Sequence, residues 1–265
     1  MASRSYLFVP GNRPDRFQKA WEAGADAVIV DLEDAVPAEQ KAGARQTISG
    51  WLSPNHPVYV RVNGPATPWF QHDVEAVARP GLAGIVLPKT EDPKQVAGLG
   101  SFVGSAGKVI PLIETARGLW EARGIAEALR VERLAFGAID FQLDTGIDGE
   151  DEELLYARSQ LVLASRVASV LPPIDGITST LDDVDRLRRD VERARRLGFG
   201  GKLCIHPRQV QDVNRGFSPT ETEIAWARRV LEAADLSGGA SRVDGEMIDR
   251  PLLERAKRIV EQNGS

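Results

Sequence analysis

The sequence predicts an α/β protein built as a (β/α)8 barrel, or TIM barrel, followed by a C-terminal helical extension. Eight short and almost continuously apolar segments alternate with helical patterns over the first 216 residues. Strands of this kind lack polar alternation, so both of their faces are buried, as in a parallel sheet covered by helices. Eight such units in this length fit a closed barrel.

The alternative architecture is a doubly wound open sheet. Its usual nucleotide ligands need a glycine-rich phosphate turn after the first strand. Residues 10–13 read Pro-Gly-Asn-Arg, which does not match the G-x-G-x-x-G pattern. We therefore favour the barrel.

The predicted elements follow from apolar runs for the strands, and from helical spacing with proline and glycine at the helix ends. Strands are expected at residues 6–9, 27–30, 58–62, 85–89, 109–113, 133–141, 174–177 and 203–205. Helices are expected at residues 14–24, 37–52, 70–78, 118–129, 152–170 and 182–197, with a weaker one from Pro93. The sixth strand is expected to carry Asp140 at its end.

The chain changes character after residue 216. We expect residues 1–216 to form the catalytic barrel and residues 217–265 to form a helical extension that packs on a neighbouring subunit. Ser218 is a candidate cap for a helix that runs to about Leu236. A link at residues 237–241 and a last helix from Pro251 follow, so this tail is long enough to reach another barrel.

Composition excludes several classes of partner. Lys and Arg number 33 against 38 Asp and Glu, a net charge of −5, and an acidic chain without a basic tract is a poor nucleic-acid binder. No apolar run approaches the ~20 residues that span a bilayer, and no signal peptide is evident. Cys204 is the one cysteine, which excludes an internal disulfide and suits a reducing compartment. We expect a cytoplasmic protein that does not bind membranes.

Polar residues follow the apolar runs with unusual regularity. In barrels, active sites lie at the C-terminal ends of the strands. Each residue alone fits a solvated loop, but the set together is harder to explain in that way. Within it, Glu33 and Asp34 are candidate catalytic residues. The strand-end residues are Asn12, Asp31, Glu33, Asp34, Arg61, Lys89, Glu114, Asp140 and His206.

Glu114 and Asp140 end neighbouring strands and should meet at one edge of the sheet. Two carboxylates suit Mg²⁺, which keeps waters and takes further ligands from a substrate. The alternative for Glu114 is a cap on the next helix. Arg61 together with Mg²⁺ would bind and polarise a 2-oxo acid. The three histidines lack zinc-ligand spacing, and for His206, directly before Pro207, a structural role is favoured over that of a base.

At these residues the sequence resembles the HpcH/HpaI aldolase/citrate lyase family, in the branch of citrate lyase β-subunit-like proteins and citramalyl- or malyl-CoA lyases. The resemblance implies that Glu114 and Asp140 bind Mg²⁺, that Arg61 and Glu114 contact the keto-acid part of the substrate, and that the protein is a homo-oligomer, a trimer or hexamer. The matching stretches are residues 4–11, 31–36, 60–63, 87–89, 111–118, 137–141, 201–207 and 244–249.

The implied reaction is retro-Claisen cleavage of a 3-hydroxyacyl-CoA thioester to acetyl-CoA and a 2-oxo acid. Lys41 and Arg45 are candidates for the CoA phosphates, although a solvated helix face is the other interpretation. In the lyases that this chain resembles, the residue at the Asp249 position is supplied by a neighbouring subunit as a catalytic acid. The alternative is that Asp249 only caps the last helix.

Two departures and several alternatives stay open. Many family members have Glu where this chain has Ile139, and Lys where it has Glu246. The branch that acts on free aldehydes places a His in the loop at residues 31–36, and this chain has none there. The alternative functions are a citrate lyase β-subunit acting on citryl-acyl carrier protein, a malate synthase or thioesterase-like enzyme, and an inactive CoA-binding paralogue.

Overall fold

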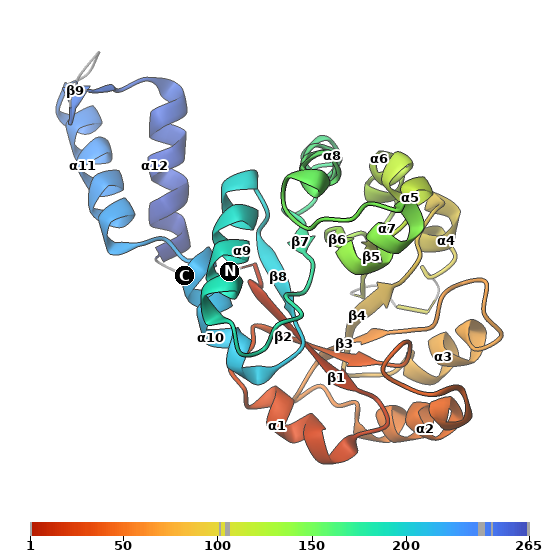
Figure 1. Ribbon diagram of the computed structural model, residues 1–265. Coiled ribbons are helices and arrows are strands. Elements are labelled where there is room, and N and C mark those ends of the chain that lie inside the picture. Colours follow the sequence, from red (N-terminus) through yellow and green to blue (C-terminus); the bar gives the residue numbers. More distant parts are fainter. Residues whose placement is uncertain (1, 101, 104–106, 238–241, 245, 264–265) are drawn as a thin grey trace. The chain divides into compact units, whose positions relative to one another are not determined.

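Eight parallel strands form a closed barrel, in the order β1 to β8, in the computed structural model (Figure 1). The structure describes residues 2–100, 102–103, 107–237, 242–244 and 246–263. Every strand pairs with its neighbour in the chain, and β1 closes the ring on β8. The predicted barrel is thus confirmed. The strands are β1 Ser5–Pro10, β2 Ala27–Asp31, β3 Val58–Arg61, β4 Leu82–Leu87, β5 Lys108–Ile113, β6 Ala135–Phe136, β7 Ile174–Asp175 and β8 Gly201–Cys204.

Helices follow the strands and cover the outside of the barrel (Figure 1). Short 3-10 turns, η1 Pro14–Arg16, η2 Ala38–Gln40 and η3 Glu152–Leu154, precede three of them. The helices of this part are α1 Phe17–Trp21, α2 Lys41–Trp51, α3 Phe70–Val77, α4 Pro93–Ala97, α5 Ala116–Trp120, α6 Ala122–Ala126, α7 Ala138–Thr145, α8 Leu155–Val167, α9 Val184–Leu197 and α10 Pro207–Phe217.

Alternate strand residues fill the inside of the barrel. Side chains two residues apart share a face of a strand, so Tyr6 and Phe8, Ile110 and Leu112 point inward in pairs. One apolar cluster results, which contains Tyr6, Ala27, Ile29, Tyr59, Val86, Ile110, Leu112, Ala135, Ile174 and Leu203. The inside of the barrel is therefore a packed core.

The sixth strand differs from the prediction. It ends at Phe136, and α7 begins at Ala138 after Gly137. Asp140 therefore lies in the first turn of a helix rather than at the end of a strand. Where the apolar run continues into α7, Phe141 is buried and packs against Phe136 with ring centroids 5.5 Å apart, whereas Ile139 is 51% exposed.

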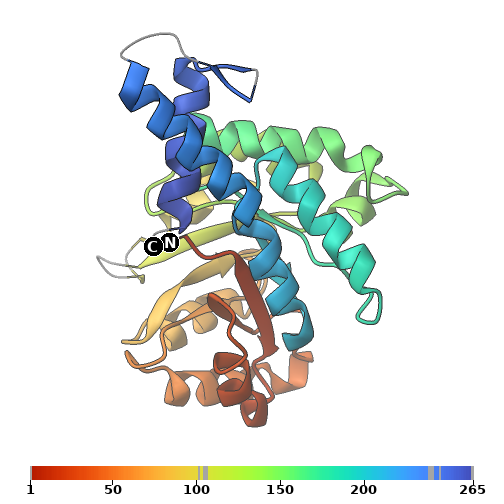
Figure 2. The ribbon, with the colours of Figure 1, turned by 90° about the vertical axis from the view of Figure 1, so that its left-hand side faces the viewer.

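The chain divides into two compact units, Ala2–Asn214 and Arg215–Ser265. In the second unit, α11 Glu221–Ser237 and α12 Arg250–Asn263 pack side by side, with a two-stranded sheet of β9 Arg242–Val243 and β10 Glu246–Met247 (Figure 2). Its core contains Ala227, Val230, Ile248, Ala256 and Ile259. Most of the expected link lies outside the described residues, since the description stops at Ser237 and resumes at Arg242.

The cap of α11 also differs from the prediction. Thr220, not Ser218, receives the backbone N–H of Glu223 at 3.2 Å, and the Glu223 carboxylate accepts the N–H of Thr220 at 2.8 Å. This reciprocal pair is a capping box. Among the described residues, no helix is both long and apolar enough to cross a membrane.

Candidate active site

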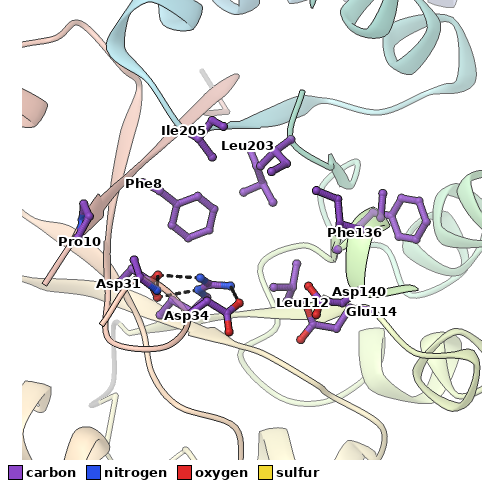
Figure 3. Close-up of a pocket in the computed structure, with 16 residues that line it drawn as sticks. Phe8, Pro10, Asp31, Asp34, Leu112, Glu114, Phe136, Asp140, Leu203 and Ile205 are labelled. Atoms are coloured by element: carbon purple, nitrogen blue, oxygen red, sulfur yellow. Dashed lines mark hydrogen bonds and ion pairs between the residues drawn. The ribbon is translucent and has the colours of Figure 1, made fainter. Parts of the chain in front are cut away.

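A cavity of about 450 Å³ opens at the carboxyl ends of the barrel strands. Two sides of it differ in chemistry (Figure 3). We call one side the acidic arc; it consists of Asp31, Asp34, Glu114 and Asp140 and follows strands β2, β5 and β6. We call the other side the apolar wall; it consists of Phe8, Ile177, Leu203 and Ile205 and comes from β1 and from the β7 and β8 region.

Arg61, at the end of β3, is bonded to the loop that follows β2. Its Nε and Nη2 donate to the two carboxylate oxygens of Asp31, both at 2.7 Å. Its Nη1 lies 2.9 Å from Glu33 Oε2 and 3.3 Å from Asp34 Oδ2. A guanidinium has five N–H donors, so these four contacts leave one N–H group, on Nη2, that can face a ligand. The carboxylates raise the pKa of Arg61 despite its burial.

The loop at residues 31–35 is held together by hydrogen bonds from its own backbone to Asp31. The N–H groups of Glu33 and Ala35 donate to the two Asp31 oxygens at 2.9 and 3.1 Å. Both carboxylate oxygens of Asp31 therefore accept hydrogen bonds from within the protein. Asp34 has a 61% exposed side chain and one long contact to Arg61, so it is the freest carboxylate of this loop.

Lys41 and Arg45, the candidates for the CoA phosphates, both have partners within the protein. Lys41 is buried, and its ammonium donates to the carbonyl oxygens of Leu32 and Glu33, both at 2.8 Å. Arg45 Nη1 pairs at 2.9 Å with the fully buried Asp73. The spacing of the two residues on α2 suggested an exposed pair, but both side chains turn toward the loop after β2 and the start of α3.

Glu114 is buried directly after β5, beside Asp140 (Figure 3). The backbone N–H of Lys89 donates to Glu114 Oε1 at 2.7 Å, and Lys89 Nζ lies 3.0 Å from Glu33 Oε1. Lys89 adopts a left-handed backbone with φ of 50°, which few non-glycine residues adopt, so it occupies a strained position between two acids.

Gly137 lets the two carboxylates approach. A Cβ at this position would lie 2.6 Å from both the Cβ and Oε2 of Glu114. Glycine is thus required sterically where α7 begins, and the first turn of α7 brings Asp140 over Glu114. Sequence reasoning placed both acids correctly at one edge but missed Gly137, whose only signal is its position between the strand and the helix.

Burial and like charge raise the pKa of Glu114 to about 8. Burial is the largest cause, followed by repulsion from Glu33 and Asp140. The hydrogen bond from the Lys89 N–H and the charge of Arg61 lower the pKa, but by less. Burial likewise raises the pKa of Glu33. A buried acid beside other acids lacks a compensating cation, and two carboxylate donors fit Mg²⁺, which completes its shell with water and substrate. Among the described residues, no group of three or more His, Cys, Asp or Glu could hold a metal alone.

Two further predicted residues make local structural contacts. His206 Nδ1 accepts the backbone N–H of Arg208 at 3.1 Å, which is a structural contact at the start of α10. Asp249, in the second unit, accepts the N–H of Leu252 at 2.9 Å and so caps α12. Its side chain is also exposed, so capping does not prevent a second role.

The apolar wall was not predicted as part of the site. The sequence does contain a pattern that indicates it: Phe8 follows Tyr6 at a spacing of two, so both side chains lie on the same face of the strand and point into the barrel. Its ring lies 4.9 Å from the Arg61 guanidinium carbon.

A cavity at the carboxyl ends of barrel strands, with carboxylates and an arginine converging on it, is where (β/α)8 enzymes carry their active sites. The molecule therefore has the architecture of a barrel enzyme. The chain belongs to the HpcH/HpaI aldolase/citrate lyase family, whose model matches residues 4–207.

Relatives extend this likeness over the whole chain. A citrate lyase subunit beta-like protein of Deinococcus radiodurans is 39% identical, over 97% of this chain and 96% of that protein. The crystal structure of CitE from Mycobacterium tuberculosis with magnesium, acetoacetate and coenzyme A matches with a TM-score of 0.89 and 34% identity, over 100% and 99% of the two chains. A citrate lyase beta subunit of M. tuberculosis with oxaloacetate and magnesium matches with a TM-score of 0.74 and 33% identity, over 82% and 98%.

Proposed function

We propose that this protein is a Mg²⁺-dependent carbon–carbon lyase that cleaves a 3-hydroxyacyl-CoA to acetyl-CoA and a 2-oxo acid. The observation that carries this proposal is the approach of Glu114 and Asp140, beside Arg61, in one cavity at the carboxyl ends of the strands. Relatives crystallised with magnesium and either coenzyme A or an oxo acid support the same ligands for this chain.

Each residue of the cavity has a distinct part in the proposed reaction. Mg²⁺ bound by Glu114 and Asp140 would stabilise the charge that develops on the oxygen of the 2-oxo acid. Arg61, fixed by Asp31, adds positive charge at the same place. Asp34 is our candidate for the base that removes the hydroxyl proton, because it lines the cavity and makes only one long contact. Glu33 does not line the cavity and positions Lys89 and Arg61.

The bond changes are those of a retro-Claisen cleavage. The hydroxyl proton moves to Asp34, the hydroxyl carbon becomes the carbonyl of the 2-oxo acid, and the bond from that carbon to the α-carbon of the thioester breaks. The electron pair of that bond stays with the α-carbon, so the enolate of acetyl-CoA forms and is then protonated to acetyl-CoA. We propose Asp249 of a neighbouring subunit as the donor of that proton, in a homo-oligomer. The buried thiol of Cys204 suits a reducing compartment such as the cytoplasm, which we propose as the location.

A second candidate is a citrate lyase β-subunit that acts on citryl-acyl carrier protein. The name of the Deinococcus radiodurans relative favours it. An assay of the purified protein with Mg²⁺ and malyl-, citramalyl- and citryl-CoA, read by release of the 2-oxo acid, tests the proposal. Release from at least one thioester, lost in EDTA, is the expected result. Inactivity on all three CoA esters with activity on a citryl carrier would favour the second candidate.

A further inference from the structure

The charge balance of the cavity restricts which 2-oxo acid it can hold. Among the described residues that line the cavity, Arg61 is the single cation. It is already within 3.3 Å of three carboxylates, those of Asp31, Glu33 and Asp34. Lys89 pairs with Glu33 at 3.0 Å and does not line the cavity.

The two sides of the cavity both disfavour a second anionic group on the ligand. On one side, the apolar wall offers only hydrocarbon, and an unpaired carboxylate buried there loses its hydration without compensation. On the other side, Mg²⁺ would offset the charges of Glu114 and Asp140, and Arg61 offsets that of Asp31, but the carboxylate of Asp34 would still repel a second anion. A substituent that points from the metal-binding carboxylates across the cavity faces the apolar wall, since Phe8, Leu203 and Ile205 lie opposite Glu114 and Asp140 (Figure 3).

An alkyl substituent has the opposite preference. The apolar wall is continuous with the buried core, because Leu203 belongs to the apolar cluster inside the barrel and Phe8 and Ile177 pack against that cluster. Burying a methyl or a branched alkyl group there removes apolar surface from water at no electrostatic cost.

We infer that this site selects 3-hydroxyacyl thioesters whose 2-oxo acid fragment carries an alkyl group, and discriminates against fragments with a second carboxylate. The inference rests on the proposed function and narrows it to the citramalyl type of substrate over the citryl type. A relative has been crystallised with oxaloacetate and magnesium, so the claim concerns relative affinity and not exclusion.

A pair of isosteric ligands tests the claim. Oxaloacetate and 4-methyl-2-oxopentanoate have nearly the same shape, with a carboxylate in the first where the second has an isopropyl group. Calorimetric titration of the full-length protein at saturating Mg²⁺ should give at least about tenfold tighter binding for 4-methyl-2-oxopentanoate and for pyruvate than for oxaloacetate, the size of one unfavourable buried charge.

A charge added to the apolar wall should reverse this preference. Ile205 is 37% exposed, so Ile205→Lys can be accommodated, and it should tighten oxaloacetate at least about fivefold relative to 4-methyl-2-oxopentanoate. Ile205→Gln is the matched control, since it is polar without charge and should not produce this gain.

The outcomes separate the inference from the function on which it rests. Equal or tighter binding of oxaloacetate by the wild type would overturn the inference and leave the lyase proposal standing. An Ile205→Lys variant with no gain for oxaloacetate would also count against it. If pyruvate and 4-methyl-2-oxopentanoate both fail to bind in the presence of Mg²⁺, the proposed function falls, and the inference falls with it.

Discussion

Ionisation of Glu114 should make the metal-free protein sensitive to pH. A carboxyl with a folded-state pKa of about 8 and an ordinary value near 4.5 when unfolded keeps its proton more strongly in the native state. Its contribution to stability is complete below about pH 4.5 and is lost as the pH rises toward 8, by up to ~1.4 kcal/mol for each pH unit. In EDTA, the melting temperature of the wild type should therefore fall as the pH rises over this range.

The control is Glu114→Gln, which keeps the hydrogen bond from the Lys89 N–H but has no charge to lose. It should show less destabilisation between pH 5 and 8 than the wild type, and Mg²⁺ should stabilise only the wild type, because a ligand stabilises the state that binds it. Parallel pH profiles of the two proteins in EDTA would contradict this assignment.

Arg61 should tolerate no conservative replacement. Lysine keeps the charge but cannot reproduce the paired contacts to Asp31, and it leaves Glu33 or Asp34 with less compensation. We expect Arg61→Lys to lose at least about tenfold in kcat/KM, or ~1.4 kcal/mol of transition-state stabilisation. Steady-state kinetics alongside circular dichroism will separate this loss from unfolding. Kinetics like those of the wild type would place Arg61 outside the reaction.

At the level of elements, the turn between β6 and α7 sets the metal geometry. Gly137→Ala would force a methyl group against Glu114, 2.6 Å from its Oε2, so the carboxylate must move. We expect Mg²⁺ affinity to fall at least about tenfold, since small displacements of a ligand have large effects.

A glycine in an open environment provides the control for this change. Gly43, in α2, has nothing within 4 Å of an added Cβ, and Gly43→Ala should raise stability by about 0.5–1 kcal/mol without changing Mg²⁺ affinity. Equal Mg²⁺ affinities for wild type and Gly137→Ala would show that Glu114 is not held by this turn.

The same turn shows why part of the site could not be predicted. Apolar periodicity placed all eight strands and the edge where Glu114 and Asp140 meet. It could not separate a two-residue strand from the helix after it, because the apolar residues at 133–141 belong first to the sheet and then to α7. The position of Asp140 in a helical turn is a product of tertiary packing.

Side-chain partners were equally beyond the reach of sequence patterns. The i, i+4 spacing of Lys41 and Arg45 fits an exposed pair as well as a buried one. The partners that the structure shows lie outside the helix, since Asp73 is 28 residues from Arg45 and the carbonyl groups of Leu32 and Glu33 are 9 and 8 residues from Lys41. Local turn chemistry was similarly ambiguous where both Ser218 and Thr220 could cap α11.

For the whole molecule, the question is whether Asp249 only caps α12 or also serves a neighbouring barrel. Asn is as good a cap as Asp but cannot donate a carboxyl proton. We expect Asp249→Asn to keep the melting temperature of the wild type and to lose at least about tenfold in kcat. Asp249→Ala should lose both the cap, worth about 1 kcal/mol, and the activity.

Mixed oligomers test the origin of this residue. Asp249→Ala and Glu114→Ala should each be inactive alone, and co-refolded mixtures should regain part of the activity, because one interface then joins an intact barrel to an intact tail. Full activity of Asp249→Asn would reduce the residue to a cap. An absence of recovery despite proven subunit exchange would assign it to its own barrel.

The central claim is that Glu114 and Asp140 hold Mg²⁺ for a 2-oxo acid, and Mg²⁺ binding tests it most directly. Isothermal titration calorimetry of wild type, Glu114→Gln and Asp140→Asn should be performed with and without pyruvate. We predict that the wild type binds one Mg²⁺ per chain, more tightly with pyruvate because the two ligands share the site. Each variant should lose at least about tenfold in affinity. Unchanged Mg²⁺ binding in both variants, or no effect of pyruvate on the wild type, would contradict the account.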